Sequence, residues 1–296
     1  MAYRKIKIYS YKTQGDYHKK TGKDCQDVIK IKIVKENEKT IRRILSLSDG
    51  AGSAKYGGIG ARENAEAVTG YFEKMSLKEF LQLPEKRQKR EILNACQKAI
   101  NKQSILKKCT DKHQFSATLL LVVIEKNKIL VAHLGDGYIA MSDQSGNNLT
   151  FQSEPDNGSA ANVTYFTVSH NAVEHLRLSV IDTGKIDVSS LVMTSDGLCT
   201  MLSNRGYGKM ESTVKELLTL FLSGKAQTKE DLKIILNEMT ELPHEENNDD
   251  RSIILMTLCP HEELQKGKQI RNISFFHFIT KKVRRKKDDK TIGRKD

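Results

Sequence analysis

The run Phe115–Ile124 (FSATLLLVVI) constrains the fold more than any other feature, because nearly every position in it is apolar. A strand with one solvent-facing side alternates polar and apolar residues, whereas a continuous apolar run is typical of a strand buried on both faces. Such a strand needs a covering layer on each side. The sequence therefore favours a layered protein with this strand in an inner sheet.

The other periodicities supply the layers. Apolar residues at about every second position predict strands at residues 4–10, 27–34 and 41–48. Helical spacing predicts one helix from about Tyr56 and a second over about 85–105. Later segments add strands at 128–134, 138–141, 191–194 and 251–258, helices at about 212–223 and 228–241, and a flap or pair of loops around weak strands at 143–190. This order predicts two stacked sheets with helix pairs outside.

Membrane and disulfide-stabilised classes are not expected. No window approaches 18 consecutive apolar residues, and Met1–Ile6 lacks the continuous apolar stretch of a signal peptide. The five cysteines are odd in number and none pairs with C-x-x-C spacing, which argues against a disulfide framework or a zinc knuckle. We expect a cytoplasmic protein with reduced thiols.

The positive charge is concentrated at the C-terminus. The chain has a net charge of +12, and Lys281–Asp296 alone contains nine basic and three acidic residues. We expect one domain over residues 1–260 and a basic, flexible tail over 261–296. The tail is either a solvated end or a contact for nucleic acid, an anionic surface or an acidic partner, with the solvated end favoured.

Aspartates stand beside four of the predicted strands. Asp27 begins one strand, Asp49 and Asp196 each follow one in a Ser-Asp-Gly unit, and Asp249 and Asp250 precede the last. Such positions can converge at a sheet edge, and converged carboxylates repel one another unless cations or protons lie between them. Oxygen ligands alone point to the hard ions Mg²⁺ or Mn²⁺ rather than to zinc.

The glycines that follow two of these aspartates allow a close approach of the backbone. Without a Cβ, Gly50 lets its carbonyl come near an ion, and Gly197 permits a tight turn. A single Asp-Gly pair is also ordinary turn chemistry. The combination of several strand-end aspartates, rather than any one pair, indicates the metal site.

Six short motifs, in this order, resemble those of the type 2C metal-dependent Ser/Thr protein phosphatases. They are Cys25-Gln26-Asp27, residues 48–52 (SDGAG), residues 115–118 (FSAT), Gly135-Asp136-Gly137, residues 194–197 (TSDG) and residues 249–252 (DDRS). Residues 162–166 (NVTYF) resemble a flap segment of a bacterial branch of that family. The resemblance implies an α+β fold, a four-layer α/β/β/α sandwich of two antiparallel sheets flanked by helix pairs, and makes residues 1–260 the catalytic domain.

The resemblance also implies roles for the acidic positions. Asp49 would bridge two ions, and the Gly50 carbonyl would bind one of them. Asp196 and Asp249 would hold the other ion. Asp27 would support the site through metal-bound water.

Two further acidic positions are assigned in the same way. Asp136 matches the family's position for a third, looser ion. Asp250 stands where many members have Asn, and the register of the Asp-Asp-Arg-Ser motif makes Asp249 the ligand.

The implied activity is hydrolysis of phosphoserine and phosphothreonine on proteins. A water shared by two Mn²⁺ or Mg²⁺ ions would lose its proton near neutral pH and attack phosphorus, while the ions neutralise the phosphoryl oxygens. No phosphoenzyme is needed, so Ser48 and Ser195 are interpreted as turn or strand residues. The partners would be a phosphorylated protein and the Ser/Thr kinase that the enzyme opposes.

The phosphate-binding position departs from the family pattern. Many members carry an arginine about five residues before the first aspartate, where this chain has Gly22. His18, Lys20 and Lys23 lie nearby, and His18 is the preferred substitute for that positive charge. A solvated loop is the alternative for each of them.

Two other positions depart as well. Ala51 stands where some members use a histidine as leaving-group acid, and Tyr138 stands where the family has an arginine. His133 lies in an apolar strand and is interpreted as a core residue rather than as that acid.

Two other classes of function remain open. The missing arginine and histidine would fit a catalytically weak or inactive pseudophosphatase that acts as a regulatory binding module. A basic protein that binds nucleic acid through the tail would instead show salt-sensitive binding that depends on residues 281–296 and not on Asp49.

Overall fold

The computed structural model describes residues 6–37, 40–156, 164–203, 210–223, 228–240 and 249–257. The strands of one sheet are β1 (Lys7–Thr13), β10 (Arg251–Thr257), β9 (Ser190–Thr194), β6 (Tyr138–Ser142) and β7 (Leu149–Ser153). The strands of the other sheet are β2 (Val28–Asn37), β3 (Thr40–Ser48), β4 (Leu119–Glu125), β5 (Lys128–Leu134) and β8 (Arg177–Asp182). Both are given in their spatial order, and neighbouring strands pair antiparallel.

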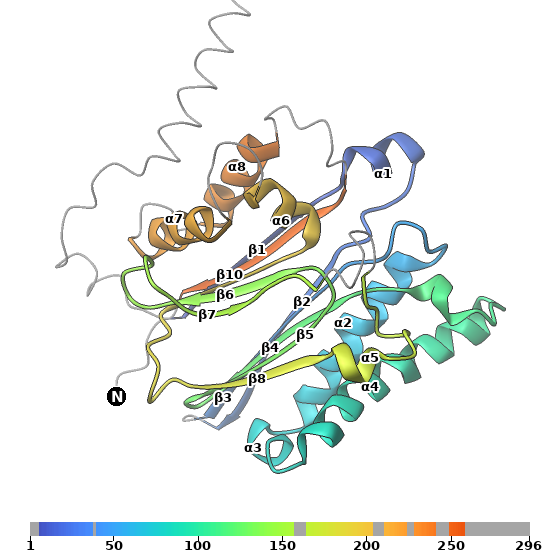
Figure 1. Cartoon of the computed structure of the whole chain (residues 1–296), viewed down its shortest axis with the longest axis horizontal. Coiled ribbons are helices and arrows are strands. Elements are labelled where there is room, and N and C mark those ends of the chain that lie inside the picture. The colour runs from blue at the N-terminus through green and yellow to red at the C-terminus, as the bar shows by residue number, and fades with distance from the viewer. Residues whose placement is uncertain are drawn as a thin grey trace, which may run out of the picture.

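Helices cover the outer face of each sheet (Figure 1). The second sheet carries α2 (Gly57–Lys74), α3 (Leu77–Phe80), α4 (Glu85–Leu106) and α5 (Ala172–His175). The first sheet carries α6 (Asp196–Ser203), α7 (Met210–Leu222) and α8 (Lys229–Thr240). A short helix α1 (Asp16–Thr21) and a 3₁₀ helix η1 (Lys112–Phe115) complete the described elements. The α+β class and the four-layer α/β/β/α sandwich are confirmed.

Strand β4 shows why the apolar run constrains the fold. Leu119, Leu121 and Val123 pack in the cluster beneath α2 and α4. The alternate residues Leu120 and Val122 pack between the two sheets. Because successive strand side chains point to opposite faces, both faces of β4 need apolar residues. A third cluster lies between the first sheet and α7 and α8.

The structure differs from the sequence-based expectations at several boundaries. Residues 112–115 form η1, so the strand expected from Phe115 begins at Leu119. The region 143–190 contains two ordered strands, β7 and β8, each at the edge of a sheet. The turn expected at Gly197 is wrong, because Asp196 and Gly197 open helix α6. Leu198 and Cys199 are buried in the cluster beneath α7, and that burial favours the helix.

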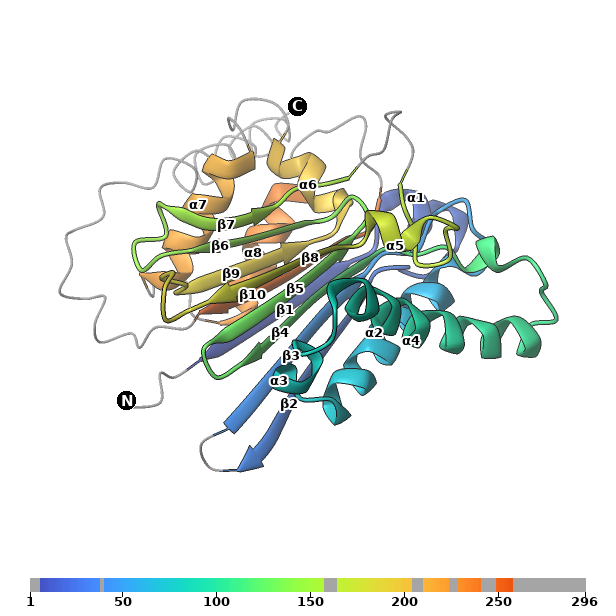
Figure 2. The ribbon, with the colours of Figure 1, turned by 60° about the horizontal axis from the view of Figure 1, so that its bottom comes forward.

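The strand registers bring the aspartate-bearing ends to one end of the sandwich. The start of β2 pairs with the end of β3, with Val28 opposite Ser48. The end of β9 lies beside the starts of both β10 and β6, with Thr194 opposite Ile253 and Tyr138. The β5–β6 loop and α1 each connect the two sheets at this end (Figure 2).

Two other findings bear on the sequence-based expectations. The four cysteines within the described residues, Cys25, Cys96, Cys109 and Cys199, are free thiols. Among the described residues, no helix combines the length and the apolar character needed to cross a membrane. The basic tail at 261–296 and residues 162–163 of the expected flap lie outside the described residues.

Candidate metal centre

Five aspartates from separate segments interact at this end of the sandwich. They are Asp27 before β2, Asp49 after β3, Asp136 in the β5–β6 loop, Asp196 at the start of α6 and Asp249 before β10. The charges of Asp27, Asp196 and Asp249 all act on Asp49, and the charge of Asp136 acts on Asp196. The structure thus gathers the aspartates that the sequence placed beside distant strands.

Burial and mutual repulsion make several of these carboxyls hard to ionise. Burial is the largest cause at Asp49, whose pKa rises well above its ordinary value, and the charges of Asp27 and Asp196 raise that pKa further. Burial also raises the pKa of Asp196 to about 7 and that of Asp27 to about 6. Carboxyls that resist ionisation in the absence of a cation fit a divalent-ion site, where the ion would supply the missing positive charge.

Asp27 is held in place by a serine from the other sheet. The Ser195 hydroxyl donates to Asp27 Oδ2 at 2.8 Å and accepts from the Ser252 backbone N–H at 3.0 Å. Asp27 Oδ1 is buried and has no hydrogen-bond partner among the residues that the structure describes. A buried oxygen without a donor fits an acceptor for an ion or for water. Ser195, interpreted from sequence as a turn or strand residue, therefore orients one of the site's carboxylates.

The backbone around Asp49 is fixed by η1, the following loop and α2. The Asp49 N–H donates to Thr118 Oγ1 at 3.0 Å, and the Thr118 N–H donates to the Asp49 carbonyl at 2.9 Å. A Cβ on Gly50 would lie 2.3 Å from the carbonyl carbon of Gly57, the first residue of α2. The start of α2 therefore requires glycine at position 50, in addition to the close approach to an ion that the sequence suggested.

Asp136 is held by a residue of the expected flap segment at 162–166. The Thr164 hydroxyl donates to Asp136 Oδ2. Burial is the main cause that raises the Asp136 pKa, and the hydrogen bond from Thr164 opposes that rise. Asp136 therefore belongs to the cluster, at the position that the family resemblance gives to a third ion.

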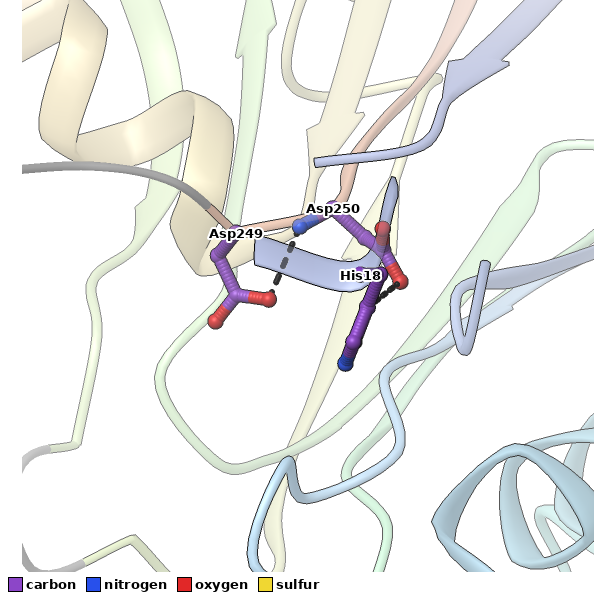
Figure 3. A group of neighbouring side chains, drawn as sticks. All are labelled: His18, Asp249 and Asp250. Atoms are coloured by element: carbon purple, nitrogen blue, oxygen red, sulfur yellow. Dashed lines mark hydrogen bonds and ion pairs between the residues drawn. The ribbon is translucent and has the colours of Figure 1, made fainter. Parts of the chain in front are cut away.

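Asp250 and His18 form a buried pair beside Asp249 (Figure 3). Asp250 accepts from His18 Nδ1 at 2.8 Å, from the Gly15 N–H at 2.7 Å and from the Gln26 N–H at 2.6 Å. The His18 side chain is only 2% exposed, and within the described part of the chain its Nε2 has no hydrogen-bond partner. One ligand atom from each of His18, Asp249 and Asp250 lies within 4.8 Å of the others.

The departures from the family pattern have structural explanations. Gly22 is the C-cap of α1 with φ of 66°, in the left-handed region that favours glycine over arginine. Tyr138 is buried in the cluster beneath α7, and its hydroxyl donates to Gln152 Oε1 at 2.8 Å. Lys20 and Lys23 are exposed, and Lys23 Nζ donates to the carbonyl of Gly52, in the loop after Asp49, at 3.4 Å.

His133 is a core residue, as expected. It is fully buried on β5, and its Nδ1 lies 2.8 Å from the Ser153 hydroxyl and 3.0 Å from the Arg177 guanidinium. Burial, followed by the Arg177 charge, lowers the His133 pKa to about 3. A neutral imidazole of this kind has no proton to give a leaving group near neutral pH.

Sequence reasoning missed two partners of the aspartates. Ser195 lies 168 positions from Asp27, and His18 lies 232 positions from Asp250. No local pattern links residues so far apart. The only signal in the sequence was the pair of aspartates before Arg251. If one of the two is the metal ligand, the other carboxylate needs a different partner.

A layered fold with clustered aspartates at one end of two antiparallel sheets provides a candidate site for divalent ions. A family model described as Protein phosphatase 2C matches residues 14–237. The chain therefore belongs to the protein phosphatase 2C family, and the resemblance drawn from its motifs is confirmed. No curated protein sequence matches it.

Solved structures share the fold at low sequence identity. A bacterial serine phosphatase aligns with a TM-score of 0.59 and 15% identity, over 90% of this chain and 100% of that chain. A serine/threonine phosphatase from S. agalactiae aligns with a TM-score of 0.59 and 18% identity, over 86% and 99%. RsbX, solved in complex with magnesium, aligns with a TM-score of 0.50 and 16% identity, over 86% and 95%. These likenesses show the fold.

Proposed function

We propose that the chain hydrolyses phosphoserine and phosphothreonine esters on proteins with the help of two divalent ions. The gathering of buried and half-buried, mutually repelling aspartates at one end of the sandwich carries this proposal. Family membership supports the reaction class, and the neighbouring structures described as serine or serine/threonine phosphatases support the substrate class.

The residues present fit a site for Mg²⁺ or Mn²⁺. Asp49 would be shared between two ions, the Gly50 carbonyl would bind one of them, and Asp196 and Asp249 would hold the other. Asp136 would hold a third, looser ion. Carboxylate and carbonyl oxygens suit these hard cations, and a neighbour of the same fold was solved with magnesium.

When bound, the ions would supply Lewis acidity that activates water for attack on phosphorus and neutralises the phosphoryl oxygens. Asp27, oriented by Ser195, would accept a hydrogen bond from a water at the site through its unpartnered Oδ1. Asp49 would fix the positions of the ions relative to the substrate phosphate. The exposed Lys23, which contacts the Gly52 carbonyl in the loop after Asp49, would be available to an approaching phosphorylated segment.

The substrate would come from a Ser/Thr kinase acting on a protein in the same compartment. The expected cytoplasmic location and the kinase partner stay predictions. The division into a catalytic domain at 1–260 and a tail at 261–296 is also a prediction. The contact of the tail with nucleic acid or an anionic surface is the weaker alternative for that tail.

The substitution Asp49→Asn tests this function directly. It removes the charge shared by two ions, so kcat/KM for a phosphothreonine peptide with Mn²⁺ should fall by on the order of 100-fold or more. Phosphate release measures the rate, and Mn²⁺ titration measures binding. Asp182→Asn, at the far end of the second sheet, is the matched control and should leave the rate within about twofold. Unchanged activity in Asp49→Asn would contradict the proposal.

A catalytically weak regulatory module is the second candidate. Gly22 and Ala51 occupy the places of the family's phosphate-binding arginine and leaving-group histidine, and this observation favours it. A wild-type chain that binds Mn²⁺ and a phosphopeptide but releases no phosphate would support this candidate over the first.

A further inference from the structure

The Nε2 atom of His18 is a buried polar atom that the proposed reaction does not use. It exposes almost no surface and has no hydrogen-bond partner among the described residues. A buried polar atom left without a partner costs free energy, so native proteins rarely retain one without a reason. Its position beside Asp249 suggests a ligand rather than a packing role.

We propose that His18 Nε2 is a nitrogen ligand to a divalent ion that it shares with Asp249, and that this ligand makes the site prefer Mn²⁺ to Mg²⁺. The inference rests on the proposed metal-dependent function, because it concerns the same end of the sandwich. It adds a ligand type that oxygen-based motifs do not contain.

The hydrogen bonds of Asp250 fix the state of the imidazole. Its carboxylate receives backbone N–H groups from Gly15 and Gln26 as well as the His18 ring, so it acts as an acceptor throughout. His18 Nδ1 is therefore the donor of its pair. In the neutral ring, the proton on Nδ1 leaves the lone pair on Nε2.

This arrangement is the one that metal-binding histidines use. Their second ring nitrogen donates to a carboxylate, which orients the ring and raises the basicity of the ligand nitrogen. Figure 3 shows the His18 ring with one nitrogen at Asp250 and the other at the opposite end of the ring, toward the side to which the Asp249 carboxylate also points. Asp250 here has the supporting role, and Asp249 the ligand role.

The spacing fits two ligands on one ion. One atom each from His18, Asp249 and Asp250 lies within a 4.8 Å limit. Ligands with bonds of about 2.1–2.2 Å lie roughly 3 Å apart when adjacent and roughly 4.3 Å apart when opposite. The group as a whole is therefore compact enough to supply ligands to one ion.

Burial separates this role from the phosphate contact that the sequence suggested. The phosphate of a protein segment is a large group and needs an accessible partner, whereas the His18 side chain is 2% exposed. A single ion at bonding distance requires much less room. Mg²⁺ demands near-ideal octahedral coordination and gives up its waters reluctantly, so a buried nitrogen ligand should disfavour Mg²⁺ relative to the first-row ion Mn²⁺.

Pulsed electron paramagnetic resonance of the full chain loaded with Mn²⁺ tests the assignment. We expect a ¹⁴N coupling to Mn²⁺ that becomes a ¹⁵N coupling when the wild-type chain is labelled with ¹⁵N-histidine. The coupling should disappear in His18→Ala and persist in His113→Ala, a matched control at an exposed histidine in η1. The Kd for Mn²⁺ should rise about 10-fold or more in His18→Ala, and the Kd for Mg²⁺ by less than about twofold.

The labelled wild-type chain keeps the test valid even where His18→Ala fails to fold. Bound Mn²⁺ without any histidine coupling would overturn the assignment. In that case, loss of activity in Asp49→Asn would still support the proposed function. A wild-type chain that binds no Mn²⁺ would overturn both.

Discussion

At the scale of single residues, Asp249 and Asp250 before β10 have different roles. Asp249 faces the other aspartates of the candidate metal centre, whereas Asp250 turns inward and accepts three hydrogen bonds. Two of these donors are backbone N–H groups on either side of α1, so Asp250 ties that helix to β10. The position is commonly Asn in the family, but the His18 pairing gives this chain a reason for a carboxylate.

The substitution Asp250→Asn tests that reason. The amide keeps one acceptor oxygen and brings two donors into a buried place where three donors already converge, so the free energy of unfolding should fall by about 1–3 kcal/mol. Urea denaturation in the presence of EDTA measures it without a contribution from metal. Asp111→Asn, at the exposed N-cap of η1, is the matched control and should cost less than about 1 kcal/mol. Equal stability of the two variants would show that Asp250 is not a required acceptor.

At the scale of elements, α2 supports the end of the second sheet that holds Asp27 and Asp49. Its first residue packs against Gly50, and its side chains cover β3 and β4. Gly60, one turn in, presses against the carbonyl of Phe115, where an added Cβ would lie only 2.0 Å from the oxygen. The contact holds η1 in place before residues 116–118, which support Asp49.

Substitutions at two glycines of α2 distinguish the effect of tight packing from the effect of helix propensity. Gly60→Ala should lower the free energy of unfolding by about 1–3 kcal/mol, because the methyl group must displace backbone. Gly70→Ala places its Cβ in open space and should raise stability by about 0.5–1 kcal/mol. Thermal unfolding of both variants gives the comparison. If both changes stabilised the protein, the tight contact between α2 and η1 would be disproved.

At the scale of the whole molecule, the sandwich brings charges together that the unfolded chain keeps apart. Asp27 and Asp196 have folded pKa values of about 6 and about 7, above the value of about 3.9 for an unfolded aspartate. The folded state without metal therefore binds more protons than the unfolded state. This contribution to stability is fully present below about pH 4 and is lost as pH rises through about 6–7.

Metal should reverse this loss of stability. A divalent ion binds the ionised carboxylates, so the rise in Tm caused by Mn²⁺ over EDTA should be small at pH 5 and larger at pH 8. Scanning calorimetry across this range measures it. Asp196→Asn lacks one titrating ligand. In this variant, the difference in Tm between Mn²⁺ and EDTA should therefore increase less with pH than in the wild type. If the difference in Tm between Mn²⁺ and EDTA were the same at every pH in the wild type, the coupling between these carboxyls and the ion would be contradicted.

The sequence by itself determined the elements and the list of acidic candidates. Strand and helix periods arise from neighbours a few residues apart, so the run at β4 and the apolar face of α2 were predictable within a few positions. The motifs around Asp27, Asp49, Asp136, Asp196 and Asp249 identified the family for the same reason: each is short and continuous.

Only the tertiary structure decided how those candidates are supported. The pairing of His18 with Asp250 joins α1 to the start of β10, and that of Ser195 with Asp27 joins the two sheets; no local pattern encodes such contacts. Helix α6 also begins where a turn was expected, because burial against α7 outweighs the turn preference of Asp-Gly. Local preferences are small compared with the free energy of burying apolar side chains, so packing settles positions at which the two disagree.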